Sequence, residues 1–303
     1  MRIRDHDVTT TSEIRPLVET FFDKDTGTFS YVVYDCAGGT AAIIDPVLDI
    51  EMASARTSTA SADALLEFVQ ANGLHVEWVL ETHAHADHLS AGGYLRDRLG
   101  TKLAIGQGIV EVQARFKALF GLDDEFVADG RQFDRLFVDG DAFRIGRCEA
   151  RVLATPGHTD DGLTYLIGDA AFVGDTVFAP EIGTARCDFP GGDARRLFGS
   201  IRKILALPPD TRLFLCHDYP PVGRQPAAES SIALQASDNV HIRGGANEDD
   251  FVSMRNARDA KLPVPRLLLP ALQVNIRGGR LPDADPGGIA YLKLPLNQFG
   301  GKP

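Results

Sequence analysis

The stretch Thr82-His83-Ala84-His85-Ala86-Asp87-His88 places four potential metal ligands within six residues. It directly follows the apolar run 76–80, which predicts a strand, so the stretch would lie at the C-terminal end of that strand. Alternate residues of an extended segment point the same way, which directs His83 and His85 to one side. Imidazoles and a carboxylate clustered in this way indicate a metal or catalytic site.

Three later segments each place a possible ligand directly after an apolar run that predicts a strand. They are Thr155-Pro156-Gly157-His158-Thr159, Gly174-Asp175-Thr176 and Cys216-His217-Asp218-Tyr219. A Gly-Asp pair alone is an ordinary turn signal. Taken in order after the first cluster, however, the three segments predict one site assembled from strand ends that are distant in the sequence.

Short strands and helices alternate along the rest of the chain. Apolar runs bounded by turn residues predict strands at 32–34, 41–44, 76–80, 102–105, 136–138, 142–145, 149–154, 163–167, 171–173 and 213–215. Capping residues followed by apolar periodicity predict helices that begin at Ser61, Ser90, Asp193 and Asn247. The Asn247 helix should be halted at Pro263, and the polar residues 51–61 should form a surface loop.

The composition changes after about Pro220, where proline and glycine become frequent and the apolar runs become short. A chain of 303 residues is long enough for one large domain or two modest ones. We therefore expect a core domain over residues 1–225 and a C-terminal extension, residues 226–303, packed on that core.

The formal net charge of −11 argues against a nucleic-acid partner, which would require a basic surface. An anionic small substrate would need a local cationic patch. No run of eighteen apolar residues predicts a membrane span, and the N-terminus lacks the apolar stretch of a secretory signal. We therefore expect a cytoplasmic protein without membrane contact, and a homo-oligomer, most simply a dimer.

The four cysteines are too far apart in sequence to suggest a disulfide framework or a structural zinc site. They are Cys36, Cys148, Cys187 and Cys216. We expect buried thiols, and we assign no catalytic role to Cys187.

The ordered series Asp45, His83-x-His85-x-Asp87-His88, His158, Asp175 and His217 resembles the five-motif signature of the metallo-β-lactamase superfamily. The resemblance covers about residues 28–220. It implies an α/β fold, the αββα sandwich, with the metal at one edge between two sheets. The superfamily hosts many reactions, so this fold alone does not give the function.

Finer segments resemble the persulfide dioxygenases, which oxidise glutathione persulfide with O2 to sulfite and glutathione and use a single Fe(II). These segments are 155–165, 183–189 and 216–219, and residues 251–279 resemble the bacterial members described as β-lactamase-like hydrolases. The resemblance implies that His83, His158 and Asp175 hold the iron. Two histidines and one carboxylate leave open positions for substrate and O2 on one face of the metal.

The same resemblance assigns roles to the remaining candidates. His85, Asp87, His88 and His217 would either orient the ligands or hold a second metal. Tyr219 and Asp218 would lie beside them as catalytic residues. Arg186 occupies the position next to the glutathione pocket, where a guanidinium is a good partner for a carboxylate.

The nearest alternative is a hydroxyacylglutathione hydrolase of the glyoxalase II type, with two metals, commonly zinc. One metal would be held by His83, His85 and His158, the other by Asp87, His88 and His217, and Asp175 would bridge them. A shared hydroxide would then attack the thioester. The segment 186–189 and the C-terminal sequence favour the dioxygenase.

Two other classes are less well supported by the sequence. A nuclease of the same superfamily usually has an inserted domain or a basic arm, which the acidic charge and the short spacing from Asp175 to His217 do not suggest. A binding protein on an inactive scaffold is disfavoured because the ligand set is intact.

Overall fold

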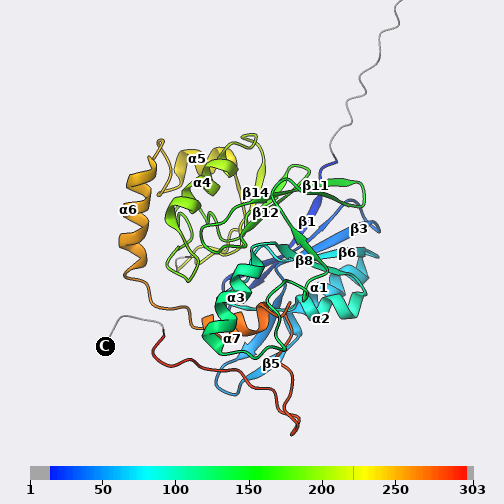
Figure 1. The fold of residues 1–303 in the computed structure, drawn as a ribbon. Helices are drawn as coiled ribbons and strands as arrows, with labels where there is room; N and C mark the ends of the chain where they lie inside the picture. The colour runs from blue at the N-terminus through cyan, green and yellow to red at the C-terminus, as the bar shows by residue number, and fades with distance from the viewer. Residues whose placement is uncertain (1–13, 221, 299–303) are drawn as a thin grey trace, which may run out of the picture.

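The structure is a computed structural model that describes residues 14–220 and 222–298. Within these residues two six-stranded β-sheets face each other, and helices cover the outer side of each sheet (Figure 1). The four-layer α/β sandwich predicted from the sequence is therefore confirmed.

The first sheet combines an antiparallel N-terminal part with parallel strands. In spatial order its strands are β1 (Leu17–Asp23), β2 (Thr28–Tyr34), β3 (Thr40–Ile44), β6 (His75–Leu80), β8 (Lys102–Gly106) and β9 (Arg135–Phe137). The strands β3 and β6 are parallel neighbours, so their carboxyl ends meet at one edge of the sheet. The strands predicted at 32–34 and 41–44 are confirmed and form the antiparallel pair β2–β3.

The second sheet is mostly antiparallel. Its order is β10 (Ala142–Ile145), β11 (Cys148–Ala154), β12 (Leu163–Ile167), β13 (Ala170–Phe172), β14 (Arg212–Phe214) and β15 (Glu229–Ser231). Because β12 is antiparallel to both β11 and β13, these two strands run in the same direction, and β14 runs parallel to β13. The carboxyl ends of β11, β13 and β14 therefore share an edge.

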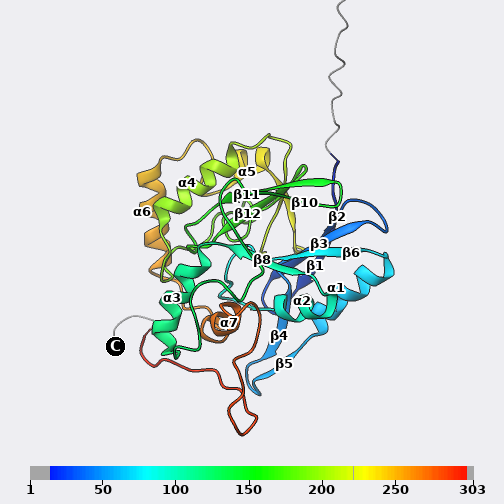
Figure 2. The ribbon, with the colours of Figure 1, turned by 45° about the vertical axis from the view of Figure 1, so that its right-hand side comes forward.

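The helices form two groups on opposite sides of the sandwich (Figures 1 and 2). The group against the first sheet is α1 (Ala60–Ala71), α2 (Gly92–Leu99), α3 (Ile109–Phe120) and α7 (Leu268–Asn275). The group against the second sheet is α4 (Ala194–Leu205), α5 (Ile232–Asp238) and α6 (Glu248–Asp259). A small sheet made of β5 (Arg56–Ser58), β4 (Val47–Glu51) and β7 (Leu89–Ser90) lies beside the first group.

Successive side chains of a strand point to opposite faces of its sheet, and this alternation separates the core into layers. In β2, Tyr31 and Val33 face the space between the sheets, whereas Val32 packs with the helices outside. In β14, Phe214 likewise faces inward and Leu213 packs against α4. These two strands are therefore apolar on both faces, which explains why the sequence shows short continuous apolar runs there.

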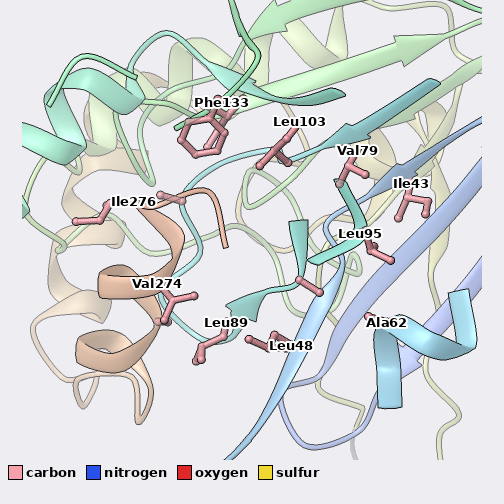
Figure 3. Packing of buried hydrophobic residues seen from close by; sticks show 14 of the residues in the cluster. Ile43, Leu48, Ala62, Val79, Leu89, Leu95, Leu103, Phe133, Val274 and Ile276 are labelled. Atoms are coloured by element: carbon pink, nitrogen blue, oxygen red, sulfur yellow. The ribbon is translucent and has the colours of Figure 1, made fainter. Parts of the chain in front are cut away.

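The C-terminal helix α7 contributes to the core that covers the first sheet. Val274 of this helix and Ile276, which directly follows it, lie in the same apolar layer as Leu89, Leu95 and Leu103 (Figure 3). The proposed division of the chain at residue 225 stays a prediction. None of the helices in the described ranges is long and apolar enough to cross a membrane.

Several local predictions differ from the structure. The helix expected to begin at Ser61 begins at Ala60, and the Ser61 hydroxyl donates instead to Asp49, at 2.6 Å. Residues 56–58, expected in a loop, form strand β5. The helices α3 and α7 were not predicted, whereas the capping roles of Asp193 and Asn247 are confirmed. The helix after Asn247 ends at Asp259, before Pro263.

The apolar layer under the first sheet generates a stability prediction. Leu103 is fully buried in this layer, whereas Leu294 is 64% exposed. Leu103→Ala should lower the free energy of unfolding by about 2–5 kcal/mol, because it removes packed atoms and leaves a cavity. Leu294→Ala should change it by less than about 0.5 kcal/mol. Urea unfolding of both variants measures the difference, and equal effects would contradict this description of the core.

Candidate metal centre

The predicted ligands converge because the carboxyl ends of the strands meet at one edge of the sandwich. The ligand loop, residues 81–88, follows β6 and leads into β7. His158, Asp175 and His217 follow β11, β13 and β14, respectively. An antiparallel bridge between Thr28 and His217 joins the two sheets at this edge.

Two glycines allow the loops of the second sheet to pack closely. Gly157 has φ +142°, and a Cβ there would lie 2.3 Å from the backbone nitrogen of Leu197 in α4. Gly174 has φ +51°, and its Cβ would lie 2.9 Å from the Cβ of Thr82. Since L-residues rarely adopt these conformations and no space remains, glycine is required before both His158 and Asp175.

One group of candidate ligands consists of His83, His158 and Asp175. Each offers one ligand atom, and these atoms lie within 4.8 Å of one another. His158 Nε2 is 3.5 Å from Asp175 Oδ2. The structure therefore brings together the three residues that were expected to bind iron.

The second group consists of His85, Asp87, His88 and His217, whose ligand atoms also lie within 4.8 Å of one another. Nε2 of His217 lies 3.0 Å from Asp87 Oδ2 and 3.2 Å from Asp175 Oδ1. Asp175 is thus adjacent to both groups, in the position expected of a bridging carboxylate.

The donor atoms of these side chains suit a positive ion. Six of them are buried yet form no hydrogen bond within the described residues: His83 Nε2, His85 Nδ1, Asp87 Oδ2, His88 Nε2, Asp175 Oδ1 and His217 Nε2. Buried polar atoms are normally paired, so such a cluster needs an explanation. Imidazole nitrogens with carboxylate oxygens are a suitable donor set for zinc or iron, and both groups fit a metal ion.

The opposite ring nitrogens of the histidines contact groups that fix the ring orientation. His83 Nδ1 lies 3.0 Å from the Thr82 hydroxyl, which donates to Asp45 at 2.8 Å. His85 Nε2 lies 3.0 Å from Asp45 Oδ1 and 3.5 Å from the buried Glu81 carboxylate. Such partners orient metal ligands and raise their basicity.

His158 and His217 are oriented in the same way. His158 Nδ1 lies 2.7 Å from the backbone carbonyl of Arg186, so it donates and leaves Nε2 as the lone-pair donor. The Thr28 hydroxyl lies 3.2 Å from His217 Nδ1 and 3.5 Å from His88 Nδ1. The ligand-side nitrogens of these rings are therefore the ones directed at the centre.

Electrostatics distinguishes the two histidines of the H-x-H pair. Burial, together with the nearby His85 and His158, lowers the pKa of His83 well below its usual value, which favours the neutral form that binds metals. Burial would also lower the pKa of His85, but Asp45 and Glu81 outweigh it and raise that pKa well above the usual value. The two carboxylates thus favour a proton on Nε2 of His85.

A cavity of about 570 Å³ opens beside the two groups of candidate ligands. Its lining includes His158 and Asp175 of the first group and Asp87 of the second. The remaining lining residues, the outer wall, are mainly apolar and basic, and many of them lie in residues 258–266, at the end of α6 and directly after it. The volume lies within the range of small-molecule binding sites.

Arg186 lines this cavity, as expected, but its guanidinium already has partners. It forms a bidentate pair with Asp188, at 2.6 and 2.7 Å, and donates to the Pro263 carbonyl at 2.8 Å. The guanidinium also lies over the Phe189 ring, 4.8 Å from its centroid. Its charge is therefore partly balanced by Asp188.

The two predicted catalytic residues lie in different surroundings. The ring of Tyr219 lines the cavity and stacks on His217, with centroids 6.0 Å apart. The carboxylate of Asp218 is fully buried away from the cavity and forms a bidentate pair with Arg224, at 2.6 and 2.7 Å. Burial raises the pKa of the Cys187 thiol.

Other residues of the cavity were not identified from the sequence. His241 lines its wall and accepts a hydrogen bond from the backbone N–H of Thr184 through Nδ1, at 3.0 Å. The side chains of Arg258 and Arg266 also line it and form no ion pair within residues 14–220 and 222–298. Isolated arginines in a sequence give no signal of this role, because most arginines are exposed.

Comparison with known proteins agrees with this geometry. The family model described as "Metallo-beta-lactamase superfamily" matches residues 23–217. A probable metallo-hydrolase of Burkholderia pseudomallei is 53% identical over 92% of this chain and 99% of its own length. Glyoxylase B2 of Dictyostelium discoideum is 46% identical over 92% of this chain and 97% of its own length.

Two further similar proteins carry the name ETHE1, and one of them is described as a persulfide dioxygenase. The mitochondrial persulfide dioxygenase ETHE1 of Homo sapiens is 30% identical, over 87% of this chain and 89% of its own. The crystal structure of ETHE1 from Myxococcus xanthus superimposes with a TM-score of 0.68 at 29% identity, covering 87% of this chain and all of that one. With its sandwich fold, its seven converging candidate ligands and these relatives, the chain belongs to the metallo-β-lactamase superfamily.

Proposed function

We propose that this chain is an Fe(II)-dependent persulfide dioxygenase, with one iron held by His83, His158 and Asp175. The observation that carries the proposal is the convergence of two imidazoles and one carboxylate below an open cavity. This ligand set is typical of non-haem iron oxygenases, because it leaves adjacent positions open. The relatives named ETHE1 support the same reaction.

The proposed reaction converts glutathione persulfide, O2 and water into glutathione, sulfite and two protons. The terminal sulfur is separated from glutathione when the S–S bond breaks, and it gains S–O bonds as it loses four electrons to O2. Iron, when bound, would supply the redox centre for this transfer. The chain would supply the neutral imidazoles, the carboxylate and the cavity that binds the substrate.

The cavity chemistry supports an anionic thiol derivative as substrate. Glutathione carries two carboxylates, whereas the chain has a net charge of −11, so binding requires a local concentration of positive charge. Arg258 and Arg266 at the outer wall meet this need, and Arg186 lines the same cavity. We propose that these arginines bind the peptide carboxylates and direct the sulfur toward Asp175 and His158.

The second candidate function is a hydrolase that cleaves glutathione thioesters at a binuclear metal site. It is favoured by the second group of candidate ligands. Their buried ligand atoms lie within 4.8 Å of one another, as those of the first group do. The relative named Glyoxylase B2 supports it as well. In the dioxygenase these four residues would orient the iron ligands without binding a metal.

Metal content distinguishes the two functions. We expect protein purified without oxygen to contain one iron per chain and to consume O2 when glutathione persulfide is added. The same protein should not hydrolyse a glutathione thioester at a comparable rate. Two tightly bound zinc ions in the active protein, with thioesterase activity and no O2 uptake, would establish the hydrolase instead.

Substitution of the ligands tests which residues hold the iron. His83→Ala, His158→Ala and Asp175→Ala should each abolish both iron binding and O2 uptake. His85→Ala and His217→Ala should retain iron, but turnover should fall by about 10–100-fold because ring-orienting contacts are lost. Iron is measured in the same samples as activity. If His217→Ala loses metal as completely as His158→Ala does, the centre is binuclear.

Removal of the cavity arginines tests substrate binding. Arg258→Ala and Arg186→Ala should each raise KM for glutathione persulfide by about 10–100-fold, the range expected for a hydrogen bond to a charged group, and iron content should stay unchanged. Arg202→Ala is the control, because Arg202 is an exposed residue of α4 outside the cavity. Unchanged KM in both cavity variants would show that the substrate binds elsewhere.

A further inference from the structure

A buried asparagine of the C-terminal helix contacts the ligand loop directly. Asn275 is the last residue of α7 and is 4% exposed. Its side-chain amide donates to the backbone carbonyls of His85 and His88, both at 2.8 Å. Its side-chain oxygen accepts a hydrogen bond from the backbone N–H of Ser90, at 2.7 Å. One side chain therefore holds three backbone groups of the segment 85–90.

The chemistry of these three contacts requires an amide. Two of the backbone partners are carbonyl oxygens, which need donors, and the third is an N–H, which needs an acceptor. Asparagine has two N–H donors and a carbonyl oxygen on one short side chain, whereas an aspartate has acceptors only. Loss of the amide would leave buried carbonyls without a partner, at a substantial energetic cost.

The contacts fall on the residues that carry ligands. The carbonyls of His85 and His88 lie on either side of Asp87, so holding both fixes the peptide planes from which all three side chains project. Metal affinity depends on donor atoms being held within a few tenths of an ångström of their ideal distances. A shift of this backbone would therefore change the metal geometry even if the fold were retained.

Helix α7 is itself anchored at this end. The side chain of Gln113, which is buried in α3, donates to the backbone carbonyl of Ile276 at 2.8 Å. The apolar residues Val274 and Ile276 pack in the core beneath the first sheet (Figure 3). Asn275 is therefore presented to the ligand loop from a rigid support.

We infer that Asn275 is a positioning residue of the metal centre, through which the C-terminal segment sets the geometry of His85, Asp87 and His88. This inference rests on the metal centre of the proposed function: in a mononuclear centre the three residues would orient the iron ligands, and in a binuclear centre they would bind a metal themselves. It gives the C-terminal segment a part in metal binding although that segment contributes none of the seven ligands.

The same helix offers a matched control. Gln273 is an equally buried amide, 1% exposed, but its side chain pairs with Leu269 and Lys293 instead of the ligand loop. Asn275→Asp and Gln273→Glu each replace one amide nitrogen by oxygen, on the same helix and at similar burial. Both should lower stability, and only the first should alter the metal centre.

The experiment measures metal binding by the full-length variants without any activity assay. Zn²⁺ affinity is obtained by competition with a chelator, and Co²⁺ absorption reports the coordination geometry. For Asn275→Asp we expect affinity to fall by about 10–100-fold and the Co²⁺ spectrum to change. For Gln273→Glu we expect the affinity and spectrum of the unsubstituted protein. Asn275→Ala, which removes the amide without adding charge, should behave like Asn275→Asp.

Three outcomes would overturn the inference. The first is a folded Asn275→Ala or Asn275→Asp protein with unchanged Zn²⁺ affinity and Co²⁺ spectrum. The second is an equal loss in Gln273→Glu, which would indicate a general effect of destabilising α7. The third is failure of both Asn275 variants to fold while Gln273→Glu folds, which would show that Asn275 is needed for folding and has no separate role at the metal centre. Since O2 uptake is not measured, failure of the proposed reaction leaves these results unaffected.

Discussion

The arrangement of the metal centre depends on one buried carboxylate, that of Asp45 at the end of β3. It accepts hydrogen bonds from the backbone N–H and the hydroxyl of Thr82, at 2.7 and 2.8 Å, and lies 3.0 Å from His85 Nε2. Asp45 itself has φ +48°, a conformation that aspartate tolerates better than most residues. The parallel pairing of β3 with β6 brings this carboxylate to the start of the ligand loop. Because it anchors the loop at both Thr82 and His85, the remaining ligands are directed at a common centre.

Much of the fold and the ligand set could be predicted from the sequence, because strand ends carry recognisable signals. Apolar runs that stop at a glycine or at a ligand cluster identified β6, β11, β13 and β14, and the ligands follow them. Helix α7 was missed because it contains Pro270, which reads as a helix breaker. Proline is nevertheless tolerated in the first turn of a helix, where the backbone N–H has no intrahelical partner.

Side-chain direction was the part of the site that the sequence could not give. Arg186 has the expected place beside the cavity, but no sequence pattern indicates that its guanidinium pairs with Asp188, two residues later. Asp218 adjoins a ligand in the sequence, yet its carboxylate turns away to Arg224. Asn275 lies 187 residues from His88, with no local pattern to connect them. Contacts of this kind depend on tertiary packing, which periodicity and spacing do not encode.

The metal ligands and the outer wall of the cavity come from different parts of the chain. All seven ligands lie between His83 and His217, whereas the stretch 258–266, which forms much of the outer wall, carries none of them. Substitutions in that stretch can therefore alter which molecules are accepted without touching the reactive centre. During divergence of such proteins, one inherited set of ligands can be retained while the substrate preference drifts. Relatives within one superfamily can then bear the names of different activities, as those of this chain do.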